Sequence, residues 1–250
     1  MLNIVIPMAG HGSRFAKAGY TMPKPLIPMG SQSMIEVVID NLRPSQPHQF
    51  TFICQRAHVT AHGLDRHLEQ IAPGCHIVPI DGVTEGAACT VLLARQYIDN
   101  AAPLMIANCD QYVDMSIDDY LAAMAERGLD GLIMTMTAND PKWSFVRLDD
   151  TDRITEVVEK QVISNEATVG IYNFARGSDF VAAADAMIAR GERVNGEFYV
   201  APVYNAMIRD GAQLGYYNIG ADRAGMYGLG IPDDLDYFML NCFDRLVGKR

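Results

Sequence analysis

Apolar runs of strand length alternate, over the first half of the chain, with segments whose apolar residues recur at helical spacing. The apolar runs lie at residues 3–8, 50–54, 76–80, 103–107 and 132–137. Helices are predicted between them at residues 33–42, 85–98 and 116–127. Strands that alternate with helices in this way favour an α/β fold of three layers, in which helices cover both faces of a mostly parallel central sheet.

The pattern changes after about residue 140. Strand-like segments at 145–149, 154–158 and 168–174 follow one another with few helices between them, which predicts a smaller antiparallel lobe or an extension of the sheet. Helices are predicted again at 178–189, 198–209 and 232–247. We expect a single domain over residues 1–250, built from a lobe at 1–140, a second lobe at 141–230 and a C-terminal helix at 231–250. The cleft between two such lobes is a favourable place for a substrate.

Composition describes a globular chain that is large enough to bury a core. Of its 250 residues, 49% are hydrophobic and 20% are charged. No apolar run reaches the roughly 18 residues that a membrane-spanning helix needs. The N-terminal apolar run also lacks the basic start of a signal peptide. We therefore expect a cytoplasmic protein without a membrane segment.

Cysteine spacing and net charge exclude further classes. The five cysteines are scattered singly, without a C-x-x-C pattern or metal-ligand spacing, so buried thiols are expected rather than disulfides. The net charge of −10 argues against non-specific nucleic-acid binding. An anionic substrate must then be held by a few placed cations rather than by a broad positive surface.

The first apolar run leads directly into a glycine-rich loop, Ala9–Arg14, with the sequence A-G-H-G-S-R. Glycines after a strand allow backbone N–H groups to approach a phosphate, because no Cβ is in the way. Arg14 and Lys24 add cationic donors beside such an anion. The loop is neither a Walker A loop nor a dinucleotide-binding fingerprint, since the residues those motifs require are missing. The pattern predicts a site for a triphosphate.

This loop and the proline-flanked lysine after it resemble the nucleotidyltransferase family that makes NDP-sugars and related activated metabolites. The signature of that family is a strand, then G-x-G-[ST]-R, then P-K-P. The matching positions are Gly10, Gly12, Ser13, Arg14, Pro23, Lys24 and Pro25. The resemblance is firm over residues 3–42, fair over 80–175 and thin elsewhere.

The resemblance implies a fold, a reaction and a division of roles. The fold would be GT-A-like and of Rossmann type, and the chain would belong to a divergent branch that serves surface-polysaccharide synthesis. The reaction would transfer NMP from an NTP to a phosphorylated small molecule such as a sugar phosphate, with Mg²⁺ as cofactor and pyrophosphate released. Lobe 1–140 would bind the nucleotide and lobe 141–230 the acceptor. Arg14 and Lys24 would be catalytic, and Ala9, Gly10, Gly12 and Ser13 would bind the nucleotide.

Asp110 follows a buried strand, and ligands of open α/β sheets gather at such strand ends. Mg²⁺ is often held by one carboxylate together with phosphate oxygens and water. An aspartate that serves only a turn or a helix cap would show the same sequence pattern. The family resemblance favours the metal role for Asp110. Asp114 is a weaker candidate.

Two positions bear on the nucleobase. The small residues from Gly86 onward would let a planar base lie close to the backbone, and Gly86 matches a glycine of the family. Five residues earlier the family usually has a base-reading Gln or Glu, and here Asp81 stands. An ionised carboxylate accepts hydrogen bonds but cannot donate them, so Asp81 favours a base with an exocyclic amine. We therefore expect CTP rather than UTP or dTTP, with ATP or GTP left open on pocket size.

The acceptor site is expected around Glu159 and Lys160. A glycine-aromatic strand follows them, as in the family, whose lysine at this place holds the acceptor's phosphate. Glu197 precedes a predicted helix, where it would either bind acceptor hydroxyl or amine groups or serve as a helix-start charge. The sequence does not name the acceptor and leaves open whether the protein forms an oligomer.

One departure affects the metal. Many family members carry W-x-D-x-G-T-P near the end, and the aspartate is a second metal ligand. Gly228 stands at that position here, although Pro232 still matches. Two alternatives remain: a GT-A-type glycosyltransferase that uses an NDP-sugar, and a non-catalytic nucleotide-binding regulator. The triphosphate loop argues against the first, and Gly228 is the feature that favours the second.

Overall fold

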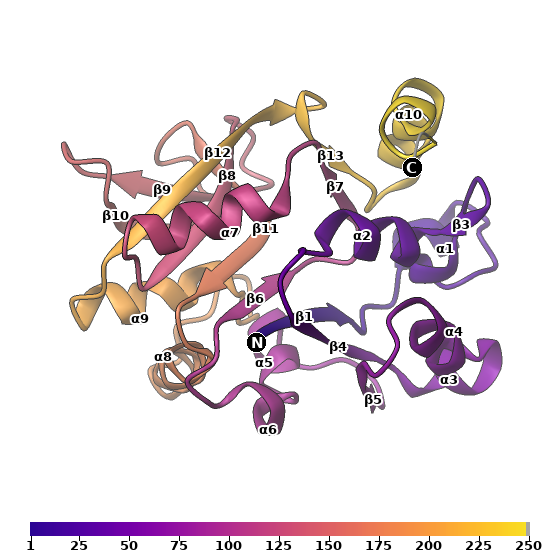
Figure 1. Cartoon of the computed structure of the whole chain (residues 1–250), viewed down its shortest axis with the longest axis horizontal. Helices are drawn as coiled ribbons and strands as arrows, with labels where there is room; N and C mark the ends of the chain where they lie inside the picture. The colour runs from indigo at the N-terminus through magenta and orange to yellow at the C-terminus, as the bar shows by residue number, and fades with distance from the viewer. Residues whose placement is uncertain (249–250) are drawn as a thin grey trace.

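The computed structural model describes residues 1–248, and strand β1 (Leu2–Met8) is an inner strand of its main sheet (Figure 1). The side chains of β1 are apolar on both faces, which suits a strand covered by helices on both sides. It pairs in parallel with β4 (His48–Gln55) on one side and β6 (Leu104–Ala107) on the other. Strand β5 (His76–Ile80) pairs in parallel with β4.

The sheet continues beyond β6 with strands of mixed direction. Within residues 1–248 it has eleven strands, in the order β5-β4-β1-β6-β11-β8-β12-β13-β7, with β9 and β10 attached beside β11. The remaining strands are β7 (Gln111–Val113), β8 (Gly131–Thr137), β9 (Ser144–Leu148), β10 (Ile154–Glu159), β11 (Glu166–Phe174), β12 (Leu214–Asp222) and β13 (Gly225–Gly228). Strand β11 is antiparallel to both β6 and β8. A separate two-stranded sheet joins β2 (Pro28–Met29) to β3 (Gln32–Ser33).

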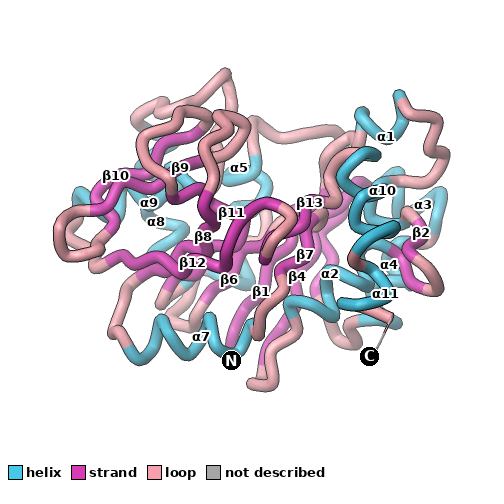
Figure 2. Tube along the Cα trace, turned by 90° about the horizontal axis from the view of Figure 1, so that it is seen from above, coloured by secondary structure: helices cyan, strands magenta, loops and turns pink. Residues whose placement is uncertain are grey.

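Helices cover both faces of this sheet (Figure 2). The helices are α1 (Ser13–Lys17), α2 (Met34–Leu42), α3 (Arg56–His62), α4 (Leu64–Ile71), α5 (Ala87–Leu92), α6 (Arg95–Ile98), α7 (Ile117–Glu126), α8 (Gly177–Ala189), α9 (Tyr204–Arg209), α10 (Pro232–Asn241) and α11 (Phe243–Leu246), with 3₁₀ turns η1 (Lys24–Leu26) and η2 (Ala201–Val203). One buried cluster includes side chains of α2, α4, α7 and α10, and the other includes side chains of α5, α6, α8 and α9. The predicted three-layer α/β class is confirmed.

Three predicted helices differ from the observed ones. The segment 85–98 is divided into α5 and α6, because Leu93 and Ala94 bond back only three residues, in a tight turn. The helix expected from residue 198 begins later: Phe198 uses its backbone in bonds to residues 85 and 88, and Pro202 has no N–H to donate. The C-terminal helix is broken at Cys242.

The expected antiparallel strands form and extend the main sheet through β11, the second of the two arrangements expected from the sequence. The division into lobes at residue 140 stays a prediction. All five cysteines are free thiols; Cys54, Cys109 and Cys242 are buried as expected, whereas Cys75 and Cys89 are half-buried. In the part of the chain that the structure describes, there is no helix of the length and apolar character that crossing a bilayer requires.

The direction of the central strands determines where the site lies. Strands β5, β4, β1 and β6 run in parallel, so their carboxyl ends share one edge of the sheet. Their following segments, at residues 81–86, 55–56, 9–12 and 108–110, therefore emerge side by side. Ligands of open α/β sheets collect at this edge.

Candidate active site

The glycine-rich loop turns sharply where β1 ends. Gly12 adopts a left-handed conformation, with φ of 60°, and its carbonyl accepts a bond from the N–H of Phe15 in α1. A Cβ added to Gly12 would lie 3.5 Å from the Cβ of Lys24. The loop and the lysine segment are thus packed together, which places the predicted phosphate-binding backbone beside the predicted catalytic cation.

Lys24 and Asp110 meet at the carboxyl end of the central strands. The Nζ of Lys24 donates to Oδ2 of Asp110 at 2.8 Å, and the two side chains are 20% and 25% exposed. Burial alone would lower the pKa of Lys24, but charge interactions, first with Asp110 and then with Cys109, and hydrogen bonds to the same two residues outweigh that effect and raise the pKa. Lys24 is therefore a fixed ammonium at neutral pH, and it lies where it can act on a phosphate.

Gly230 makes room for the Asp110 carboxylate. A Cβ at residue 230 would lie 2.6 Å from Oδ2 of Asp110, closer than real Cβ atoms come to their neighbours. The N–H of Leu229 donates to the backbone carbonyl of Asp110 at 2.8 Å, which fixes this segment against the aspartate. Gly228, where the family has its second metal ligand, pairs with Gln111 in the ladder between β13 and β7. The carboxylate closest to that position belongs to Asp234, which is also bound by Arg223 at 3.1 Å.

The Lys24–Asp110 pair lines one cavity, and a second cavity adjoins that one. The first, of about 490 Å³, is lined among others by Ala9, Gly10, Lys24, Asp110, Val83, Thr84, Gly86 and Ala87. The second, of about 320 Å³, contains Glu159, Lys160 and Tyr199. Ala87 and Asn108 line both cavities, so the cavities share a wall. Glu197 lines the first cavity, although it was expected on the acceptor side.

A third, smaller cavity lies on the other side of the Lys24–Asp110 pair. It measures about 240 Å³ and is lined by Gly12, Ser13, Arg14, Lys24, Asp110 and Gly230. The structure therefore brings the whole predicted phosphate and metal set together around one ion pair.

Gly86 lies where the first cavity meets the segment that carries Glu197. Its φ of 131° is a conformation that favours glycine. The close packing also excludes a side chain, since a Cβ would lie 2.4 Å from the carbonyl oxygen of Phe198. The N–H of Phe198 donates to Glu85, and the N–H of Ala88 donates to Phe198. Sequence reasoning identified Gly86 but missed this docking of residue 198, because the partners lie more than a hundred residues apart.

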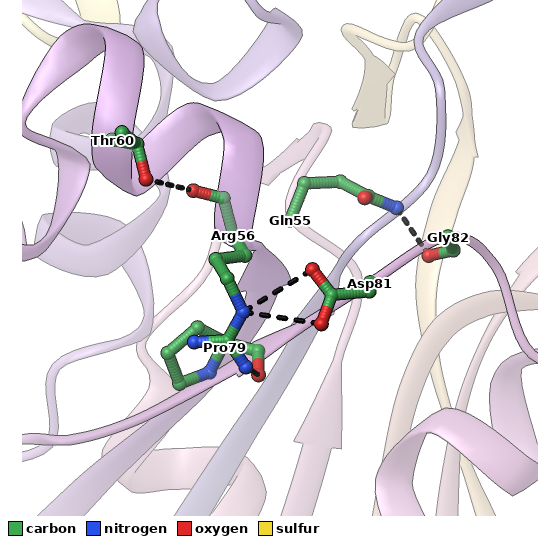
Figure 3. Close-up of polar contacts among 6 residues, drawn as sticks. All are labelled: Gln55, Arg56, Thr60, Pro79, Asp81 and Gly82. Carbon is green, nitrogen blue, oxygen red and sulfur yellow. Dashed lines mark hydrogen bonds and ion pairs between the residues drawn. The ribbon is translucent and has the colours of Figure 1, made fainter.

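Asp81 is not among the residues that line the first cavity. Its side chain is 79% exposed, and both carboxylate oxygens accept from Nε of Arg56, at 3.2 and 3.1 Å (Figure 3). It precedes Val83 and Thr84, which line that cavity. Base reading by Asp81 stays a prediction, and Arg56 competes for its carboxylate.

The second cavity holds the predicted acceptor residues. Lys160 has a φ of 57° and donates through Nζ to the hydroxyl of Tyr199 at 2.5 Å. Glu159 is buried and accepts a hydrogen bond from the Ser144 hydroxyl. Burial raises the pKa of Glu159, and the bond from Ser144 and the charge of Lys160 only partly offset this rise. The cavity thus offers a cation and a carboxylate to one ligand.

A sequence profile described as nucleotidyl transferase matches residues 4–207, which is most of the chain. The chain belongs to the nucleotidyl transferase family.

Individual relatives agree with this assignment. A nucleoside-diphosphate-sugar pyrophosphorylase from Vibrio cholerae RC9 superposes with a TM-score of 0.81 and 28% identity, covering 95% of this chain and 100% of that one. The catalytic subunit beta of mannose-1-phosphate guanylyltransferase from Danio rerio is 25% identical over 181 residues, or 70% of this chain and 50% of that protein. A UDP-glucose pyrophosphorylase complexed with UDP-glucose, at 14% identity and a TM-score of 0.76, supports the fold; it covers 100% of both chains. The chain spans about half the length of the curated relatives it matches.

Asn108 and Tyr199 line the cavities of this nucleotidyl transferase, and neither was selected from the sequence. Asn108 had a usable signal, because it is a polar residue directly after a buried strand. The absence of a side chain at Gly170 makes room for the Asn108 side chain, since a Cβ at residue 170 would lie 2.1 Å from Nδ2 of Asn108. Tyr199 had no local signal, since its role depends on contact with Lys160.

Replacing Gly230 with alanine should impair this site without unfolding the protein. The added methyl group would displace the Asp110 carboxylate, and we expect a loss of activity of about 10²-fold, as for misplacement of a reacting group by about 1 Å. The measurement is kcat/KM together with the melting temperature. Gly228→Ala is the matched control, since its Cβ would come no closer than 3.3 Å, to Oδ2 of Asp234. Equal activity of Gly230→Ala and the parent would contradict the role of Gly230.

Proposed function

We propose that this nucleotidyl transferase transfers NMP from an NTP to a phosphorylated small molecule such as a sugar phosphate and releases pyrophosphate. The observation that carries the proposal is the Lys24–Asp110 pair in the wall of the cavity beside the glycine-rich loop, together with the cavity containing Lys160, which adjoins that first cavity at Ala87 and Asn108. A donor nucleotide in the first cavity and an acceptor in the second would meet where the two cavities adjoin, with the pair on the donor's side.

The acceptor's phosphate oxygen would attack the α-phosphorus in line, forming the new P–O bond as the bond to pyrophosphate breaks. A phosphate monoester is already anionic near neutral pH, so the reaction needs no strong general base. Catalysis then rests on alignment and on neutralising charge. The backbone of residues 9–13 and Arg14 would hold the triphosphate, and Lys24 would stabilise the α-phosphate and the leaving pyrophosphate.

The second cavity supplies the groups that would orient the acceptor. Lys160 would bind its phosphate, and the oxygens of Glu159 would accept from its hydroxyl groups. Lys160 already lies over the ring of Tyr199, with Nζ 4.6 Å from the ring centre, and Lys142 lies over Trp143 at 4.8 Å. Since ammonium groups cover these aromatic faces, a sugar phosphate or polyol phosphate fits better than an acceptor with a quaternary ammonium.

The residues around Asp110 fit Mg²⁺ of the kind that phosphates help to hold. In residues 1–248 no group of three or more His, Cys, Asp or Glu side chains could hold a metal ion. One carboxylate, kept in place by the space at Gly230, matches the preference of Mg²⁺ for few protein ligands. Asp110 would be its protein ligand, and the ion would supply charge neutralisation on the phosphates.

CTP is the nucleotide we propose, on the argument that a carboxylate at residue 81 pairs with an exocyclic amine. In competition among ATP, CTP, GTP and UTP, we expect the highest kcat/KM for CTP. Asp81→Asn should narrow the CTP-to-UTP ratio by roughly tenfold, the size of one discriminating contact. A preference for UTP or dTTP in the parent would overturn this choice. The ion pair with Arg56 is the reason to measure Arg56→Ala in parallel.

The regulator alternative is favoured by Gly228, and it predicts nucleotide binding without turnover. The glycosyltransferase alternative predicts release of NDP from an NDP-sugar. The cytoplasmic location, the Mg²⁺ requirement and a role in surface-polysaccharide synthesis stay predictions.

A further inference from the structure

Gln55 joins two parts of the nucleotide cavity that belong to different strands. It is the last residue of β4, is only 7% exposed, and donates through Nε2 to the carbonyl of Ala9 and to the carbonyl of Gly82, each at 2.5 Å. A glutamine amide has two N–H donors, so this one side chain uses both. Ala9 belongs to the glycine-rich loop 9–14, called the phosphate loop below. Gly82 directly precedes Val83, Thr84, Gly86 and Ala87, which line the same cavity and are called the base-side wall below.

The sheet explains why Gln55 can reach both sides. Strand β4 lies between β1 and β5, and its register pairs Cys54 with Met8 and Gln55 with Ile80. Beyond Met8 and Ile80 the two neighbouring strands end, so the backbone ladder no longer fixes their spacing. Past the ends of these strands, the side-chain amide of Gln55 connects the segment that follows β1 to the segment that follows β5.

The receiving carbonyl belongs to Gly82, at a turn in the backbone. Gly82 has a φ of 75°, a left-handed conformation that glycine adopts without strain, and a Cβ there would meet no atom within 4 Å. Arg56 reaches the same segment with a bond from Nη2 to the Pro79 carbonyl at 3.1 Å (Figure 3). The Arg56–Asp81 pair is exposed and contributes little. The bond from Gln55 to Ala9 is buried and its loss would leave a buried carbonyl unpaired, whereas the bond to Gly82 is half-buried.

We propose that Gln55 is a positioning residue that fixes the spacing between the phosphate loop and the base-side wall. It thereby sets both the affinity for the NTP and the discrimination among bases. This inference rests on the proposed function, since it assumes that the triphosphate and the base occupy these two parts of the first cavity. A change in their spacing would weaken nucleotide binding while leaving Lys24 and Asp110 in place for the chemical step.

The test compares Gln55→Met and Gln55→Glu with Gln49→Met. Methionine fills similar volume without donating, and glutamate has the same shape but presents oxygen to two carbonyls. Gln49 is a matched control, because it lies on the same strand and donates through Nε2 to Gly74 at 2.7 Å, at the opposite end of the sheet from the cavity. Dissociation constants for ATP, CTP, GTP and UTP are measured by calorimetry with Mg²⁺ and without acceptor, and kcat, KM and melting temperature are measured in parallel.

For Gln55→Met we expect the dissociation constant of the tightest NTP to rise about tenfold, the differences among the four NTPs to shrink, and kcat to change by less than about threefold. Gln55→Glu should bind weakly near pH 8 and recover towards pH 6, because the protonated carboxyl can again donate one bond. The parent and Gln55→Met should show no such recovery, and Gln49→Met should behave as the parent.

Unchanged NTP dissociation constants in both Gln55 variants would overturn the inference, as would a fall in kcat without a change in binding. If Gln55→Met does not fold, the pH recovery of Gln55→Glu decides the matter, and its absence counts against the inference. A parent that binds none of the four NTPs would instead overturn the proposed function, so the two failures are distinguishable.

Discussion

Replacing Lys24 with alanine should lower kcat by about 10²-fold or more, while the KM for the NTP changes much less. Lys24 lies at the junction of two cavities and is held as an ammonium by Asp110. Its charge is best placed to stabilise the negative charge that develops on the transferring phosphoryl group and on pyrophosphate. Loss of an interaction made mainly in the transition state lowers kcat and kcat/KM together.

Lys17→Ala is the matched control for Lys24. Lys17 is an exposed lysine of α1, seven residues away in the sequence, and is not among the residues that line the three cavities described above. We expect it to keep parental kinetics. Equal activity in Lys24→Ala and the parent would remove Lys24 from the mechanism, and an increase in KM alone would restrict it to ground-state binding.

Asp110→Asn should retain the fold and raise the Mg²⁺ concentration needed for half-maximal activity by roughly 10- to 100-fold, the range found when metal-site residues are changed. The amide is isosteric but lacks the negative charge that attracts the ion. The variant also removes the ion pair with Lys24, whose pKa Asp110 helps to raise. Kinetic titration with Mg²⁺ gives the requirement, and Mn²⁺ binding followed by electron paramagnetic resonance in the presence of NTP gives the affinity without turnover.

Asp114→Asn provides the comparison for Asp110. Asp114 follows β7 and lies 3.7 Å from Arg245, so its loss should leave the metal dependence unchanged. If Asp110→Asn keeps the parental Mg²⁺ requirement and Mn²⁺ affinity, the metal is held elsewhere. Asp114 and Glu197 are then the carboxylates to change next.

The parts of the site that were predictable are those with a local sequence signal. The apolar run 3–8 and its glycines predicted a strand and a phosphate loop, and Asp110 was recognised because it follows a buried strand. Lys24 and Asp110 are 86 residues apart, yet they meet because β1 and β6 are parallel neighbours. Alternation of strands and helices was enough to predict the α/β class.

The parts that were not predictable depend on which strands become neighbours. Gln55 and Arg56 act on residues 79–82 because β4 pairs with β5, and that pairing turns Asp81 towards Arg56. Helix α3 was missed because none of its side chains is buried, so it shows no apolar stripe. Strands β12 and β13 were missed because half-exposed and glycine-containing segments resemble loops.

The most direct measurement is pyrophosphate release by the purified protein with Mg²⁺, each of the four NTPs and a panel of phosphate monoesters that includes sugar phosphates, polyol phosphates and phosphocholine. We expect release that requires both an NTP and a phosphate monoester, with one nucleotidylated product formed per pyrophosphate, and we expect Lys24→Ala to lose it. Nucleotide binding without release from any pair would contradict transfer and support a regulator. NDP-sugars are assayed alongside. Release of NDP from an NDP-sugar, with no pyrophosphate from any NTP, would contradict nucleotidyl transfer and support a glycosyltransferase.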